Sequence, residues 1–185
     1  MQTPIAYIIS FAIVSIVMAL PNQVTMRSVN SPWYKCIRAS FTPPKYVFPI
    51  VWTTLYIFIA ITLAQTLLLK ESDTKLIRTA SSHRDLWSPN GVSWLEDFIP
   101  NTKYQLLGLY AFNLILNVAW SFAFFGEHNV LGAFIILLAL IVSGGMILWK
   151  SRRVLPPWVS YLLVPYVGWL CFAGILNGAS LLKTC

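Results

Sequence analysis

Charged residues are scarce in this sequence. Only 10% of its 185 residues are charged, whereas 57% are hydrophobic and the mean hydropathy is +0.69. A typical soluble domain carries about 25% charged residues. The composition therefore excludes a water-soluble globular protein. It predicts an integral membrane protein that has the lipid bilayer as part of its surroundings.

Groups that bind metals or nucleic acids are also few. The two histidines, His83 and His128, are far apart in the sequence, and the three cysteines have no metal-like spacing. The net charge of +7 does not indicate nucleic-acid binding, because the 13 Lys and Arg lie between apolar runs, as is typical of membrane flanks. We expect no metal site, no nucleic-acid partner and no required cofactor.

Five long apolar runs predict five transmembrane helices. The first run lacks the basic lead and cleavage site of a signal peptide, so we expect it to be retained. The four-residue turn before the fourth run makes the third and fourth helices antiparallel neighbours. The predicted spans are 4–20, 46–69, 104–125, 130–149 and 158–182.

The connectors predict which span ends share a side of the membrane. Eight basic residues lie in the connectors 70–103 and 150–157, on the side of the amino terminus, and five lie on the other side. The positive-inside rule therefore favours a cytoplasmic amino terminus. The connector 70–103 is long at 34 residues, which indicates a lid or a partner-binding segment.

No Asp, Glu, Lys, Arg or His lies within any predicted span. Ion pumps, proton-coupled carriers and voltage sensors place ionisable groups at membrane depth, so these classes are disfavoured. Acid–base hydrolysis inside the membrane is disfavoured for the same reason. The interior is instead predicted to contain uncharged polar and aromatic side chains.

Three spans each carry an aromatic or amide face at helical spacing. Facing inward together, they would line a cavity suited to a flat, mostly apolar ligand with carbonyl or carboxyl groups. The alternative is that the asparagines form interhelical hydrogen bonds and the rings are ordinary packing. The faces comprise Phe48, Trp52 and Tyr56; Asn113, Asn117, Trp120 and Phe124; and Tyr166, Trp169, Ala173 and Asn177.

Read as strings, these residues resemble the signature of the TspO/MBR family, which includes tryptophan-rich sensory proteins and translocator proteins (peripheral benzodiazepine receptors). The resemblance covers four of the five spans. It is carried by Trp33-Tyr34, Phe41-Thr42-Pro43-Pro44, Val47-Phe48-Pro49, Val51-Trp52-Thr53-x-Leu55-Tyr56, Asn117-x-x-Trp120-Ser121-x-x-Phe124-Phe125-Gly126 and Pro165-Tyr166-x-x-Trp169-x-x-Phe172-Ala173-x-x-Leu176-Asn177.

The resemblance implies a single all-α membrane domain over residues 1–185, with five transmembrane helices in an up-and-down bundle that commonly forms a homodimer. It implies one cavity near the first connector that binds protoporphyrin IX-like tetrapyrroles, benzodiazepine-type compounds or sterols. Gly178 replaces the Tyr of the sterol-recognition pattern, which weakens the sterol expectation. The implied ligand-binding positions are Tyr34, Phe48, Trp52, Tyr56, Asn117, Trp120, Trp169 and Ala173.

Three functions are compatible with this resemblance. The leading one is a membrane receptor, carrier or sensor with a porphyrin ligand. The second is a light-dependent porphyrin-degrading enzyme in which Trp52 and Trp169 face the bound ring. The third is a scaffold that recruits partners through the connector 70–103. The sequence does not distinguish the mitochondrial outer membrane from another organelle membrane or a bacterial membrane.

Overall fold

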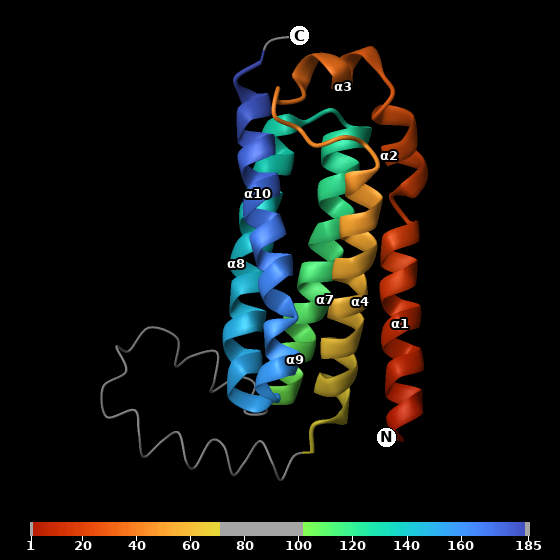
Figure 1. Ribbon diagram of the computed structural model, residues 1–185, viewed down its shortest axis with the longest axis vertical. Helices are drawn as coiled ribbons and strands as arrows, with labels where there is room; N and C mark the ends of the chain where they lie inside the picture. Colours follow the sequence, from red (N-terminus) through yellow and green to blue (C-terminus); the bar gives the residue numbers. More distant parts are fainter. Residues whose placement is uncertain (1, 71–101, 184–185) are drawn as a thin grey trace, which may run out of the picture.

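The computed structural model describes residues 2–70 and 102–183, which form helices and no strands (Figure 1). Most of the predicted connector 70–103 lies outside the described residues. Five helical segments are long and apolar enough to cross a membrane, which confirms the predicted all-α, multi-pass membrane protein. These segments are Thr3–Ser28, Val47–Leu68, Thr102–Gly126, Val130–Val154 and Pro157–Leu181.

The spans are built from long helices with shorter helices at their ends. The first span bends after α1 and continues as α2, and a separate short helix, α3, precedes the second span. The elements are α1 (Thr3–Ala19), α2 (Asn22–Ser28), α3 (Pro32–Ile37), α4 (Val47–Leu68), α7 (Thr102–Ser121), the π-helix η1 (Phe122–Gly126), α8 (Val130–Val154), α9 (Pro157–Tyr161) and α10 (Leu163–Leu181).

Prolines define several of these boundaries. Pro21 separates α1 from α2, and Pro49 lies in the first turn of α4, where a missing N–H does not break a helical hydrogen bond. Pro165 cannot donate to the carbonyl of the residue four positions earlier, and the fifth span is correspondingly divided into α9 and α10.

The fourth helix extends beyond its predicted end at residue 149. It continues to Val154 because its last turn places Arg152 and Arg153 where cations favourably meet the negative end of the helix dipole. The Arg153 guanidinium lies 3.9 Å from the centre of the Trp149 ring. The predicted boundary at residue 149 was wrong because the apolar run ends there, whereas the basic residues that follow extend the helix into the polar region.

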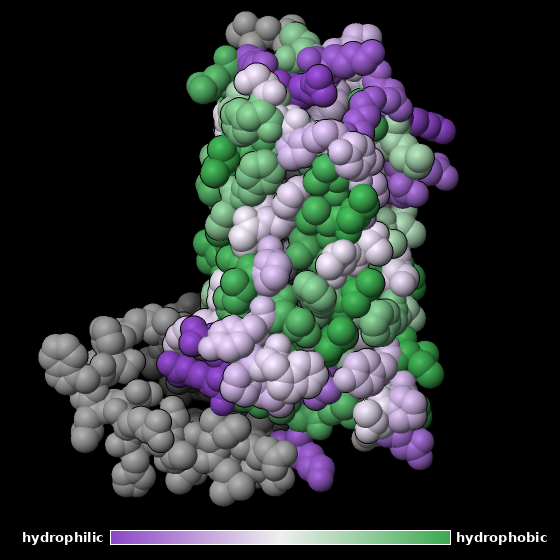
Figure 2. All heavy atoms as spheres, viewed as in Figure 1, coloured by the Kyte–Doolittle hydropathy of each residue, from purple (hydrophilic) through white to green (hydrophobic). Residues whose placement is uncertain are grey.

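The helices run alternately up and down, as expected (Figure 1). α1 packs against α4, α4 packs against α7 and α10, and α8 lies between α7 and α10. The amino terminus and the α8–α9 junction lie at one end of the bundle, and α3 and the carboxy-terminal end of α10 lie at the other. On the face shown in Figure 2, apolar side chains occupy the middle of the bundle, and the most hydrophilic ones gather towards its two ends.

The turn between the third and fourth spans has a defined geometry. His128 adopts φ of 53°, a left-handed conformation that histidine tolerates better than most residues, and its ring stacks on Trp33 with 4.0 Å between ring centres. Asn129 Oδ1 then accepts a hydrogen bond of 2.8 Å from the Gly132 backbone N–H. This side-chain cap begins α8.

Glycines allow α8 and α10 to approach closely. A Cβ at Gly174 would lie 3.4 Å from Ile141, and one at Gly178 would lie 3.5 Å from Phe134. Both neighbours are on α8, so these glycines contact another helix of the same bundle. On α8 itself, a Cβ at Gly144 would lie 3.3 Å from the Leu170 side chain of α10.

The two neighbouring glycines of α8 provide a matched test of this contact. Gly144→Leu should lower the free energy of unfolding by about 1–3 kcal/mol, because the added side chain overpacks the α8–α10 interface. Gly145→Leu should have little effect, since a Cβ there meets nothing within 4 Å. Reversible unfolding in detergent micelles measures both. Equal destabilisation by the two substitutions contradicts the packing described above.

Candidate functional site

A buried hydrogen-bond network joins three helices at the centre of the bundle. Asn117 Nδ2 on α7 donates to Tyr166 Oη on α10 at 2.8 Å, and that hydroxyl donates to Asn113 Oδ1. Asn113 Nδ2 in turn donates to Ser143 Oγ on α8 at 2.8 Å. Ser143 Oγ donates to the Leu140 carbonyl oxygen at 3.1 Å. Each donor in this chain therefore has an acceptor, and neighbouring bonds polarise one another.

The network shows how the two asparagines of α7 are used. Asn113 and Asn117 are both buried, and they lie one helical turn apart on the face towards α8 and α10. Amide groups in lipid require partners, because unpaired polar groups are unfavourable there. In this structure the interhelical alternative applies to both asparagines. A ligand contact by Asn117 stays a prediction.

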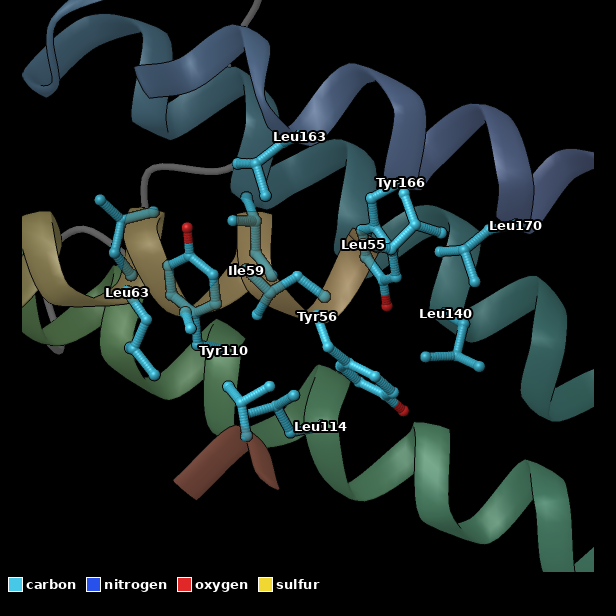
Figure 3. Packing of buried hydrophobic residues seen from close by; sticks show 14 of the residues in the cluster. Leu55, Tyr56, Ile59, Leu63, Tyr110, Leu114, Leu140, Leu163, Tyr166 and Leu170 are labelled. Atoms are coloured by element: carbon cyan, nitrogen blue, oxygen red, sulfur yellow. The ribbon is translucent and has the colours of Figure 1, made fainter. Parts of the chain in front are cut away.

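Most of the predicted aromatic residues lie along α4 and α10. The rings of Phe48 and Trp169 meet edge to face with 5.8 Å between their centres, and Trp52 lies 5.4 Å from Tyr56. Tyr56 is buried, and Trp52, Trp169 and Ala173 pack against the same hydrophobic cluster. In Figure 3 the rings of Tyr56 and of the network residue Tyr166 both point into the space between the helices.

A second aromatic cluster lies beneath α3. Tyr34 of α3 lies 5.8 Å from Phe125, measured between ring centres, and Trp120 stacks on Phe124 at 5.4 Å. Burial raises the pKa of the Tyr34 hydroxyl, and the nearby Arg38 charge partly opposes this shift. Tyr34 is therefore neutral at physiological pH and is available as a hydrogen-bonding group.

The π-helix η1 supplies part of this second cluster. The Glu127 N–H donates to the carbonyl of Phe122, five residues earlier, at 2.9 Å. This wider turn carries Phe124 and Phe125, and π-helical turns are frequent at functional sites. The apolar pattern of the sequence did not reveal it, because a single π turn changes the period too locally.

Trp120 connects the two clusters. It packs against the central cluster and against the residues beneath α3. Its Nε1 donates to Asn177 Oδ1 of α10 at 3.2 Å, and Asn177 Nδ2 donates to the Val130 carbonyl at the start of α8. Asn177 was predicted only as part of a face. Its position shows that it holds Trp120 in place.

A groove of about 430 Å³ lies between α4 and α10, and most of its lining residues were not predicted as site residues. Trp169 is the predicted ligand-binding residue that lines it. The Nε1 atom of Trp169 is buried and has no hydrogen-bond partner among the described residues. An unpaired buried donor of this kind is uncommon and requires an explanation. The other lining residues are Ile50, Val51, Thr54, Leu55, Phe58, Pro165, Gly168 and Phe172.

The eight predicted site residues thus occupy three adjoining groups. Phe48, Trp52, Tyr56, Trp169 and Ala173 lie along α4 and α10. Tyr34 on α3 and Trp120 on α7 belong to the cluster beneath α3. Asn117 belongs to the hydrogen-bond network. No Asp, Glu, Lys, Arg or His is buried in the described ranges 2–70 and 102–183. No cluster of potential metal ligands occurs there either.

Over most of its length the chain is similar to proteins from several organisms. The model of the TspO/MBR family matches residues 8–182. The Tryptophan-rich protein TspO of Chlorobaculum tepidum is 30% identical over 147 residues, which are 78% of this chain and 75% of that protein. The Translocator protein of Ovis aries is 30% identical over 158 residues, 82% of this chain and 75% of that protein. The Tryptophan-rich protein TspO of Archaeoglobus fulgidus is 31% identical over 156 residues, which are 84% of this chain and 81% of that protein.

The central network predicts a specific loss of stability. Tyr166→Phe keeps the ring but leaves Asn113 Oδ1 and Asn117 Nδ2 without their shared partner, so the free energy of unfolding should fall by about 1–2 kcal/mol. The control is Tyr161→Phe, because Tyr161 is 54% exposed. Unfolding in detergent micelles compares the two variants. A Tyr166 variant as stable as the control would show that the network contributes nothing.

Proposed function

Since the chain belongs to the TspO/MBR family, we propose that it is a membrane receptor, carrier or sensor that binds porphyrins of the protoporphyrin IX type. The observation that carries this proposal is the gathering of aromatic faces from α4, α7 and α10 in the half of the bundle nearer α3. A porphyrin is a large flat π-system, and aromatic side chains bind such surfaces through stacked and edge-to-face contacts.

Within residues 2–70 and 102–183 no charged side chain is buried, which supports an uncharged macrocycle in the interior. Burying an isolated ionic group in this region would cost much free energy, because the group would lose its hydration. Burying an apolar ring carries no such cost. The carboxylates of a protoporphyrin would lie towards the α3 end. Five of the described basic residues lie at that end, and they favour an anionic group electrostatically. They are Arg27, Lys35, Arg38, Lys45 and Lys183.

Trp169 provides a further point of support. Its indole N–H is buried without a partner among the described residues, and its ring contacts Phe48 and lines the groove of α4 and α10. A ligand with a hydrogen-bond acceptor at this position would satisfy that donor. The same groove favours sterols as a second ligand class, since its lining residues are almost all apolar.

Paired tryptophan substitutions test the proposal. Trp52→Phe combined with Trp169→Phe should weaken protoporphyrin binding about tenfold, because each substitution removes part of an aromatic contact surface. Quenching of the remaining tryptophan fluorescence by protoporphyrin measures the affinity. The control is Trp149→Phe combined with Trp158→Phe, which removes the same number of indoles from exposed positions at the opposite end of the bundle.

Illumination separates binding from degradation. A receptor or carrier should leave the porphyrin absorbance equally stable in the light with the wild type and with the Trp52/Trp169 double variant. A light-dependent decay that only the wild type accelerates would instead favour the enzymatic alternative. Unchanged affinity of the double variant contradicts the proposed site in either case.

A further inference from the structure

Cys36 lies on the exposed side of the short helix α3. Tyr34 and Ile37 of the same helix are buried, whereas Cys36 is exposed. Cys36 is disulfide-bonded in this structure, and Cys171 of α10 is free. The sequence contains three cysteines, which leaves Cys185 as the candidate partner within the chain.

The end of α10 lies next to α3. Lys183 Nζ donates a hydrogen bond of 3.0 Å to the Arg38 carbonyl oxygen, and both segments lie at the same end of the bundle (Figure 1). Arg38 follows Cys36 by two residues, and Cys185, which lies outside the described residues, follows Lys183 by two. Two residues extend by up to about 7 Å, and a disulfide joins Cα atoms about 4.4–6.8 Å apart. The chain beyond Lys183 is therefore long enough for Cys185 to meet Cys36.

We propose that Cys36 and Cys185 form a disulfide that clamps α3 to the carboxy-terminal end of α10. Its formation joins the two sulfur atoms and releases two protons and two electrons. A small-molecule disulfide accepts them and is reduced to two thiols. The positive-inside rule favours an α3 end that faces away from the cytoplasm, and disulfides persist in the oxidising compartments found there.

The clamp gives α3 a second attachment. At six residues, α3 is too short to be a stable helix by itself, so its position depends on contacts with the rest of the bundle. Its rings meet the turn between the third and fourth spans: Trp33 lies 5.7 Å from Phe124, and Tyr34 lies 5.8 Å from Phe125. A covalent bond from Cys36 attaches the opposite, exposed side of the helix to α10.

Counting thiols tests the cross-link. The full-length protein is equilibrated with glutathione disulfide, denatured in dodecyl sulfate and alkylated with iodoacetamide. Only Cys171 should react before reduction, and all three cysteines should react afterwards. Peptide mapping should recover Cys36 and Cys185 in one linked pair. Full alkylation before reduction, glutathione attached to either residue, or a link between two chains would overturn the proposal.

Hydrogen exchange tests the clamp. Reduction should speed exchange of the backbone amides of residues 33–37 about tenfold in the wild type, because the released helix opens more often. Cys36→Ser should show the fast rate with and without reductant. Cys171→Ser is the matched control and should behave like the wild type, since it removes the free thiol. Equal exchange rates before and after reduction of the wild type would contradict a clamping role.

The clamp has a consequence for the porphyrin site, and this part rests on the proposed function. Because α3 covers the rings of Phe124 and Phe125, the oxidised protein should release protoporphyrin about tenfold more slowly than the reduced protein or the Cys36→Ser variant. Equal release rates in a protein that binds protoporphyrin would count against the clamp. A protein that binds no protoporphyrin contradicts the proposed function instead, and the thiol count still decides whether the cross-link exists.

Discussion

The hydrogen bonds between Asn117, Tyr166 and Asn113 are the constraint on which the arrangement of this bundle depends. In a bilayer, an apolar helix surface gains little free energy by moving from lipid to a neighbouring helix, because both are apolar. Close packing and buried polar contacts therefore decide how the helices are rotated. The tyrosine hydroxyl meets both asparagines only in one relative rotation of α7 and α10. Ser143 then fixes α8 against the same pair.

This rotation determines where the aromatic faces lie. With Asn117 directed at α10, Trp120 one turn later reaches Asn177 and the rings beneath α3. With Tyr166 directed inward, Trp169 lies towards α4 and contacts Phe48. The polar network and the ring-bearing surface are therefore consequences of the same helix orientations. The asparagines position the proposed porphyrin site whether or not one of them touches the ligand.

Uncharged polar groups occur in both halves of the bundle, but they are satisfied differently. Near α3, side chains long enough to reach across the interfaces bond to one another directly. Around Tyr110, Thr62 Oγ1 and Thr66 Oγ1 instead donate to carbonyl groups of their own helix, α4. The basic residues at the α3 end give the two halves different electrostatic surroundings as well.

The sequence alone determined the membrane environment, the five spans and the family, because scarce charge and long apolar runs have few physical solutions. Periodicity also identified the faces of Trp52, Trp120 and Trp169. Tertiary structure decided the partner of each polar group, including the use of Asn117 in the network. Those partners lie on different helices, and helical spacing specifies which residues share a face but not which face of another helix they meet.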